Sequence, residues 1–181
     1  EKMSKKILVI STSLRANSNS DMLAEAFIEG ARETGHEVEK VSLKDKTIGF
    51  CKGCLACQKT GSCVIRDDAG AIVEKMLHSD VLVFATPIYY YEMSGQMKTL
   101  LDRANPLYTA DYAYRNVYLL AAAADEAEHA IDGAKKGLAG FIACFERAHL
   151  AGCVFAGGVD APGTVKEHAA LEKAREMGRQ V

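Results

Sequence analysis

Short apolar runs alternate with amphipathic stretches along the chain, and this alternation predicts a series of strands and helices. Strands buried on both faces of a sheet read as nearly continuous apolar runs. His36–Leu43 instead alternates, with apolar residues at Val38, Val41 and Leu43, as expected for a strand nearer an edge. Continuous runs of the buried kind predict four further strands, at Lys6–Ile10, Asp80–Ala85, Val117–Ala122 and Cys153–Val159.

Apolar residues at helical spacing predict the helices between these strands. The span Glu126–His149 is mostly helical in pattern, but Gly133, Gly137 and Gly140 each weaken a helix by about 1 kcal/mol against alanine, so a loop and then a helix fit it too. The other predicted helices are Ser20–Thr34, Asp67–His78, Gly95–Arg103 and Lys166–Met177, and the stretches predicted to be irregular are Ser11–Asn19, Lys44–Arg66, Thr86–Ser94 and Ala104–Arg115.

Five β–α units in succession predict a parallel sheet with helices on both faces, joined by right-handed crossovers. Periodicity leaves the strand order open. Five such units fit an α/β, flavodoxin-like three-layer sandwich with a five-stranded sheet of order 2-1-3-4-5. We find no repeat and no linker, so residues 1–181 are predicted to form a single domain.

The composition and net charge limit the kinds of partner that the chain is expected to bind. The 181 residues are 49% hydrophobic and 25% charged with a net charge of −2, which predicts neither nucleic acid nor an anionic membrane as a partner. The apolar run Val117–Ala124 is too short to span a bilayer, and Ile7–Ile10 is too short for the core of a secretion signal. Clustered thiols within Cys51–Cys63 suit a reducing compartment, so we expect a cytoplasmic chain.

The loop Ser11–Asp21 is the first candidate for a ligand site. In an open α/β sheet, ligands bind beyond the carboxyl ends of the strands where the strand order reverses, which here is between the first and third strands. The loop has neither the G-x-G-x-x-G nor the P-loop pattern. It does place hydroxyls, amides and one cation before a helix N-terminus, which attracts phosphate, although a helix cap in a solvated loop explains the same residues equally well. The candidate phosphate ligands are Ser13, Arg15, Ser18, Asn19 and Ser20.

The loop Thr86–Gln96 is the second candidate. Pro87 stiffens the exit from a buried strand, and Ile88–Tyr91 then offers an aromatic surface with backbone N–H groups. A flat heteroaromatic ring needs such a wall, with a few polar contacts along its edge. Packing in the core or at a dimer interface would also use these residues. Three adjacent tyrosines cannot all face one core, so at least one is expected to face a ligand or a partner.

Together the two loops resemble the NADPH-dependent FMN reductase family. The motifs are S-x-R-x-N-S-N-S after the first strand and T-P-I-Y-Y-Y-x-M-S-G-Q-M-K-x-x-L-D-R after the third, and the resemblance extends over nearly the whole chain. The second motif is the more specific, because Thr12 stands in the first where relatives often have glycine. The resemblance implies that the first loop holds the FMN phosphate and that the isoalloxazine contacts Pro87, Ile88, Tyr89, Tyr90, Met93 and Ser94. The loop after the fourth strand reads AAAADE where relatives often have threonine or glycine, and it adds Ala122 and Asp125.

The activity implied by the resemblance is that of an FMN-dependent NAD(P)H oxidoreductase, which passes hydride from NAD(P)H to FMN and electrons on to a small acceptor such as a quinone. No catalytic side chain is expected, because the flavin carries the chemistry. A homodimer or a dimer of dimers is implied, with Tyr108–Tyr114 as a candidate contact. Two alternatives remain open: a non-enzymatic flavodoxin-type electron carrier, against which the weak net charge argues mildly, and a flavin-binding regulatory protein.

Four cysteines with the spacing C-x2-C-x2-C-x5-C pose a separate question. Steps of three residues would keep the first three on one side of a helical turn, where they could hold an iron–sulfur cluster or tetrahedral Zn²⁺, or pack without metal. The spacing is similar to the compact motif of the iron–sulfur flavoproteins, a branch of this group with a 4Fe-4S cluster beside FMN, and an electron carrier of that kind is a further alternative function. The candidate metal ligands are Cys51, Cys54, Cys57 and Cys63.

The remaining chemistry-bearing residues are predicted to be structural. Cys144 and Cys153 lie in apolar surroundings and are expected in the core. Lys98, Asp102 and Arg103 are expected to form pairs on a helix surface. The five histidines show no metal-binding spacing and are expected at the surface or at helix ends: His36, His78, His129, His149 and His168.

Overall fold

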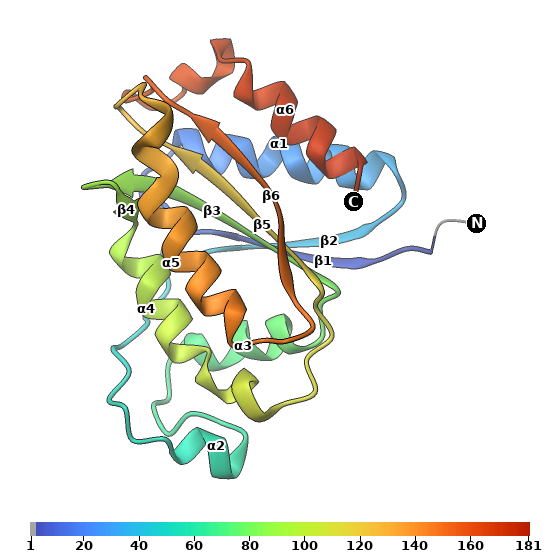
Figure 1. Ribbon diagram of the computed structural model, residues 1–181, viewed down its shortest axis with the longest axis vertical. Helices are drawn as coiled ribbons and strands as arrows, with labels where there is room; N and C mark the ends of the chain where they lie inside the picture. The colour runs from blue at the N-terminus through green and yellow to red at the C-terminus, as the bar shows by residue number, and fades with distance from the viewer. Residues whose placement is uncertain (1–2) are drawn as a thin grey trace.

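Five parallel strands form the centre of the protein in a computed structural model that describes residues 3–181 (Figure 1). Their order is β2-β1-β3-β5-β6, which is the predicted 2-1-3-4-5 order with β5 and β6 as the fourth and fifth central strands. The flavodoxin-like fold predicted from the sequence is confirmed. The strands are β1 (Lys6–Ser11), β2 (Glu37–Ser42), β3 (Val81–Tyr89), β5 (Asn116–Ala122) and β6 (His149–Ala156).

Helices cover both faces of the sheet, which explains why its central strands are apolar along their whole length. In β1, Ile7 and Val9 pack against α1 and α6, whereas Leu8 and Ile10 face the opposite core. One layer therefore contains α1 (Asn19–Glu33) and α6 (Ala170–Arg179), and the other contains α3 (Ala69–Leu77), α4 (Gly95–Arg103) and α5 (Asp132–Ala143).

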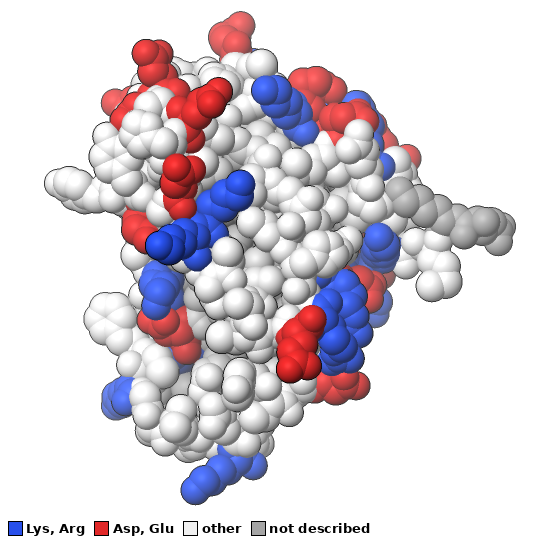
Figure 2. Space-filling model, in the orientation of Figure 1, with Lys and Arg blue, Asp and Glu red and all other residues white. Residues whose placement is uncertain are grey.

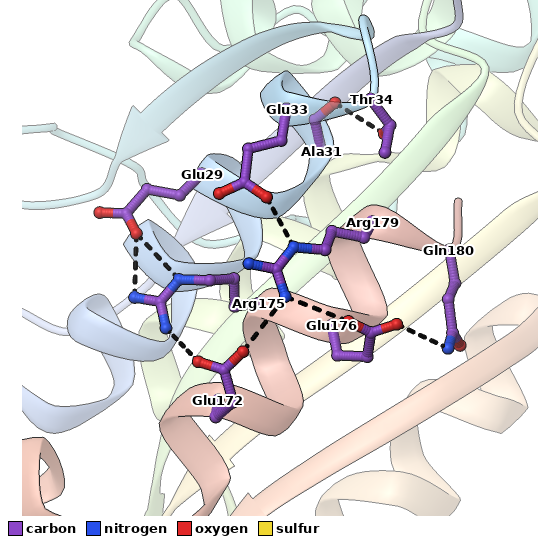
Figure 3. Close-up of polar contacts among 9 residues, drawn as sticks. All are labelled: Glu29, Ala31, Glu33, Thr34, Glu172, Arg175, Glu176, Arg179 and Gln180. Atoms are coloured by element: carbon purple, nitrogen blue, oxygen red, sulfur yellow. Dashed lines mark hydrogen bonds and ion pairs between the residues drawn. The ribbon is translucent and has the colours of Figure 1, made fainter.

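Helices α1 and α6 pack backbone to backbone. A Cβ on Gly30 would lie 1.9 Å from the carbonyl oxygen of Arg175, and a Cβ on Gly178 would lie 2.1 Å from that of Phe27. Ion pairs flank this contact, among them Arg175 to Glu29 at 3.0 Å (Figure 3). Because these pairs are exposed, each adds at most about 1 kcal/mol, and the glycine contact sets the helix spacing.

The prediction that Thr86–Ser94 is a loop is wrong in part. Strand β3 continues to Tyr89 and pairs antiparallel with the short strand β4 (Glu92–Met93), with Tyr90 and Tyr91 as the two turn residues. In a sequence, two-residue hairpin turns are usually recognised by Asn-Gly or Gly-Gly, and a Tyr-Tyr turn lacks this pattern.

Other boundaries also differ from the sequence prediction. Strand β6 begins at His149 and ends at Ala156, so the predicted strand was four residues late at its start. The glycine-rich span does break, into the 3₁₀ helix η2 (Glu128–Ile131) and α5. Further short helices are α2 (Ala56–Thr60), η1 (Asn105–Thr109) and η3 (Thr164–Glu167).

Four residues differ in burial from the sequence prediction. Cys144 is exposed and Cys153 is only half-buried, because β6 is an edge strand and Cys144 follows the last turn of α5. His36 is buried, where its Nδ1 accepts a hydrogen bond from the Lys5 backbone N–H at 3.1 Å. Arg103 is buried as well, in an ion pair with Asp67. Within residues 3–181, no helix combines the length and the apolar character that a membrane span requires.

Candidate functional site

A cavity of about 360 Å³ opens at the carboxyl end of the sheet, between the N-terminus of α1 and the tip of β3. This is the edge at which ligands bind in open α/β folds. Two lining residues, Val159 and Asp160, were not predicted to belong to the site. They follow the Gly157–Gly158 pair after β6, and this pair could have indicated a ligand-binding loop there. The full lining is Ser13, Arg15, Ser18, Asn19, Ser20, Pro87, Ile88, Tyr89, Tyr90, Ala122, Ala123, Ala124, Val159 and Asp160.

The polar residues at the N-terminus of α1 divide into two groups. Ser18 is the helix cap, and its Oγ accepts from the Asp21 backbone N–H at 3.1 Å. Asn19 is committed to the chain after β6: its Nδ2 donates to the Ala161 carbonyl at 3.1 Å and its Oδ1 accepts from the Val165 N–H at 3.0 Å. These two side chains therefore hold the wall of the cavity in place.

Ser20 is different, because its Oγ is buried in the cavity wall and has no hydrogen-bond partner among residues 3–181. Buried hydroxyls are normally paired, so an orphan in a cavity wall requires an explanation. Ser20 lies in the first turn of α1, where free backbone N–H groups and the helix dipole favour an anion. The guanidinium of Arg15 lies on the same cavity and donates to the Asp160 carbonyl at 3.1 Å. These residues fit the phosphate group of a mononucleotide.

The opposite wall is the β3–β4 hairpin. Its two turn residues, Tyr90 and Tyr91, have φ of 48° and 61°, both in the left-handed region. The left-handed region costs an L-residue roughly 1–2 kcal/mol, so other contacts must hold the turn. The hydroxyl of Tyr91 donates to the Asp125 carboxylate at 2.7 Å, and the Tyr91 ring stacks on His129 with the planes 9° apart.

Asp125 thus contacts the hairpin rather than the cavity. The Ala127 backbone N–H and then the Tyr91 hydroxyl hold the pKa of Asp125 below its usual value. The same hydrogen bond raises the pKa of Tyr91, because the phenol must stay protonated to donate. At neutral pH the contact therefore joins a carboxylate to a neutral phenol.

Two glycines of α5 form the seat on which the hairpin rests. A Cβ on Gly133 would lie 2.1 Å from the Tyr91 carbonyl oxygen, and a Cβ on Gly137 would lie 2.8 Å from the Met93 methyl carbon. In the sequence these glycines indicated only a weak helix. Met93 is accordingly buried in the core beneath the hairpin; it pairs with Ile88 but is not itself among the residues that line the cavity.

Thr12 joins the two loops on either side of the cavity. Its Oγ1 donates to the Ala85 carbonyl at 2.9 Å and lies 3.0 Å from the Oγ of Ser94, which in turn accepts from the Met97 N–H as the cap of α4. The side chain of Gln96 donates to the Thr12 carbonyl at 2.8 Å. Ser94 is fully buried and serves this network, so its predicted ring contact stays a prediction.

The four candidate metal ligands Cys51, Cys54, Cys57 and Cys63 line one small cavity of about 30 Å³. Helix α2 begins only at Ala56, so the expectation that a helical turn aligns the first three was wrong. Leu55, which lies between Cys54 and the start of α2, has a left-handed backbone with φ of 58°.

Three of the four sulfurs accept hydrogen bonds. The Gly53 N–H donates to Cys51 at 3.4 Å, the Ile65 N–H donates to Cys63 at 3.4 Å, and the Asn105 amide donates to Cys57 at 3.3 Å. The sulfur ligands of iron–sulfur clusters accept hydrogen bonds of this kind. Among residues 3–181, however, no three His, Cys, Asp or Glu side chains converge as they would on a single metal ion.

Arg103 holds both ends of this cysteine segment. Its guanidinium makes two bonds to the Asp67 carboxylate, at 2.7 and 2.9 Å, and donates to the carbonyls of Gly49 at 2.9 Å and Ile65 at 3.2 Å. Arg103 chiefly keeps the pKa of Asp67 below its usual value. The predicted surface pair exists between Lys98 and Asp102, at 2.6 Å, but Arg103 forms a buried one.

The fold and the cavity define the class: a flavodoxin-like α/β domain with a ligand cavity at the carboxyl end of its sheet. Residues 5–159 match the sequence profile of the NADPH-dependent FMN reductases, and the chain belongs to that family. It is 30% identical to YwqN of Bacillus subtilis, provisionally named an NAD(P)H-dependent FMN-containing oxidoreductase, with 95% of this chain and 96% of YwqN covered.

Several relatives are named iron–sulfur flavoproteins. One from Methanocaldococcus jannaschii is 37% identical over 102 residues, which are 56% of this chain and 53% of the relative. One from Archaeoglobus fulgidus is 40% identical over 98 residues, which are 54% of this chain and 48% of the relative. The match thus spans about half the length of these proteins.

Solved structures support the fold. An azoreductase from Bacillus anthracis superimposes with a TM-score of 0.74 at 19% identity, covering 99% of this chain and 100% of the other. An NAD(P)H:quinone oxidoreductase from Methanothermobacter marburgensis gives a TM-score of 0.69 at 20% identity, covering 98% and 97%. At such identities the likeness concerns the arrangement of the chain alone.

Proposed function

We propose that the protein binds FMN in the cavity beside α1 and acts as an NAD(P)H oxidoreductase that delivers electrons to a small acceptor such as a quinone. The observation that carries the proposal is the buried Ser20 hydroxyl, which lacks a partner in a cavity wall at a helix N-terminus. Membership of the NADPH-dependent FMN reductase family supports the same cofactor.

The chain's own residues have distinct tasks in this proposal. Ser13 and Ser20 donate to the phosphate, and Arg15 adds positive charge. The side chains of Pro87, Ile88 and Tyr89 would support the isoalloxazine on one side, whereas the ring of Tyr90 is exposed at the mouth of the cavity. Residues 122–124, all alanine, leave room on the other side of the cavity. FMN, when bound, supplies the hydride chemistry, so the protein contributes binding, orientation and electrostatics.

The test is anaerobic mixing of the FMN-loaded protein with NADPH or NADH while the visible absorption of the flavin is followed. We expect the flavin band to bleach within minutes and to return when a quinone is added. If bound flavin is bleached by dithionite but by neither nicotinamide, the reductase activity is contradicted and a flavodoxin-type carrier is favoured.

An iron–sulfur flavoprotein is the second candidate. It is supported by the four cysteines that line one cavity, the hydrogen bonds received by three of their sulfurs, and relatives with that name. The donor set suits a 4Fe-4S cluster or zinc. Anaerobic purification with iron, sulfide and zinc analysis tests it. About four irons and four sulfides per chain are expected for the cluster. Protein free of metal after anaerobic purification would leave the segment with a purely structural role.

We further propose, from the family resemblance, a homodimer or a dimer of dimers. In the candidate contact Tyr108–Tyr114, Tyr112 and Tyr114 are buried within the protomer and stack 4.6 Å apart. Tyr108 is the exposed tyrosine of that segment. Light scattering of the purified protein measures the assembly, and a monomer at micromolar concentration would contradict the proposal.

A further inference from the structure

The side chain of Tyr90 has an unusual position: the residue lines the mouth of the candidate FMN cavity, yet its relative exposure is 101%. Its neighbours Tyr89 and Tyr91 are 45% and 54% exposed. An aromatic side chain stabilises a fold when it is removed from water, and this ring is not, so it adds little to the stability of the fold. The ring is therefore fully exposed at the rim of the cavity.

The backbone of the turn is nevertheless anchored, through the residue beside Tyr90. Both turn residues have strained left-handed backbones, and the strain is offset elsewhere, through the Tyr91 hydroxyl on Asp125, the Tyr91 ring on His129 and the carbonyl of Tyr91 against Gly133. Strain that the surroundings maintain is concentrated at functional sites. The hairpin is thus built to present one aromatic ring, and every anchor belongs to the residue beside it.

We propose that Tyr90 is the stacking platform for the second substrate, a planar aromatic electron acceptor of the quinone class, as that acceptor reaches the outer face of the flavin site. The inference deepens the proposed function and rests on it. Flat rings gain from offset or edge-to-face contact with tyrosine, whereas a compact octahedral anion such as ferricyanide does not. Tyr90 therefore determines specificity among acceptors, while Tyr91 and Asp125 are positioning residues.

The experiment uses the FMN-loaded protein and compares a naphthoquinone with ferricyanide. For Tyr90→Ala, which keeps a side-chain Cβ in the same strained turn, we expect the KM for the naphthoquinone to rise about fivefold, with kcat and the KM for ferricyanide little changed. Tyr90→Phe keeps the ring and should restore the KM for the quinone. Phe50→Ala is the matched control, because Phe50 is another exposed aromatic residue, 81% exposed, and is not among the residues that line the cavity.

Three outcomes would overturn the proposal. An equal rise in both KM values would mean general damage to the site. An unchanged KM for the quinone would mean that the ring has no role in acceptor binding, and if the oligomeric state then changed, Tyr90 would belong to an interface between copies. A failure of Tyr90→Phe to restore the KM would assign the effect to the hydroxyl instead of the ring.

A second readout separates this inference from the proposed function. Bound FMN is reduced by light and EDTA without nicotinamide, and the reoxidation rate is measured against naphthoquinone concentration. If NAD(P)H fails to reduce the flavin, the reductase proposal fails while the Tyr90 variants are still compared in this assay. If the protein binds no FMN at all, both proposals are contradicted.

Discussion

The cavity beside α1 and the cysteine segment, residues 44–66, are built in opposite ways. The cavity lies at the ends of hydrogen-bonded strands, and its loops are fastened by Thr12, Ser94 and Asn19. The cysteine segment has one short helix and mostly exposed residues, and the buried Arg103 holds its two ends. The sheet therefore preforms one site, whereas the other is held by contacts with the side chains of Asp67, Asp68 and Arg103.

Charge separates the two regions as well. The cysteine segment carries Lys44, Lys46, Lys52, Lys59 and Arg66 against Asp45, a net charge of +4 within a chain of net charge −2. At the end of the molecule that carries α2, the coloured side chains visible in Figure 2 are Lys or Arg. Positive surroundings offset the net negative charge of a metal or cluster held by four thiolates, so this end is suited electrostatically to such a centre.

The largest expected effect comes from removing the support of the cysteine segment. Arg103→Met leaves the Asp67 carboxylate nearly buried and unpaired, which should lower the free energy of unfolding by about 3–5 kcal/mol in urea titrations. Lys98→Met, in the same helix, breaks an exposed pair and should cost less than about 1 kcal/mol. Similar losses in the two variants would contradict the assigned role of Arg103. The double variant Arg103→Met with Asp67→Leu should recover much of the loss.

A smaller effect is expected at the seat of the hairpin. Gly133→Ala places a methyl group against the Tyr91 carbonyl, so the hairpin or α5 must move, at a cost of about 1–3 kcal/mol, and FMN should bind more weakly. Gly140→Ala is the matched control in the same helix, where a Cβ meets open space, and it should stabilise the protein by up to about 1 kcal/mol. Calorimetry and flavin titration measure both quantities. Unchanged FMN affinity in Gly133→Ala would contradict a role of the hairpin in FMN binding.

The smallest effect concerns pH and distinguishes the two regions under mild acid. The pKa of Asp67 is lowered from an ordinary value of 3.8, so its contribution to stability is complete above that value and is lost as the pH falls through the lowered pKa. Proteolysis of residues 44–66 should therefore stay constant from neutral pH down to about pH 4 and rise only below it. In Arg103→Met, cleavage should be fast already at neutral pH. If the cleavage rate of the unaltered protein rose near pH 6, a group other than Asp67 would control the stability of this segment.

The sequence predicted the sheet because its information is local: four apolar runs and one alternating strand were sufficient to locate the core. The position of the ligand site followed from strand order, and most of the predicted cofactor contacts line the cavity. The hairpin was missed because its turn is Tyr-Tyr. The role of Arg103 was missed because Asp67 lies 36 residues earlier, and a D-R pair at the end of a helix reads as a solvent-exposed surface.

The most direct test of the account compares FMN with riboflavin, which lacks the phosphate. Fluorescence titrations of the flavin-free protein should show much tighter binding of FMN, and Ser20→Ala should weaken FMN binding about tenfold while leaving riboflavin binding unchanged. Ser79→Ala, whose hydroxyl already donates to the Lys75 carbonyl, serves as the control and should bind FMN like the unaltered protein. Equal affinity of the unaltered protein for the two flavins, or an equal loss of both in Ser20→Ala, would contradict a phosphate site at the N-terminus of α1.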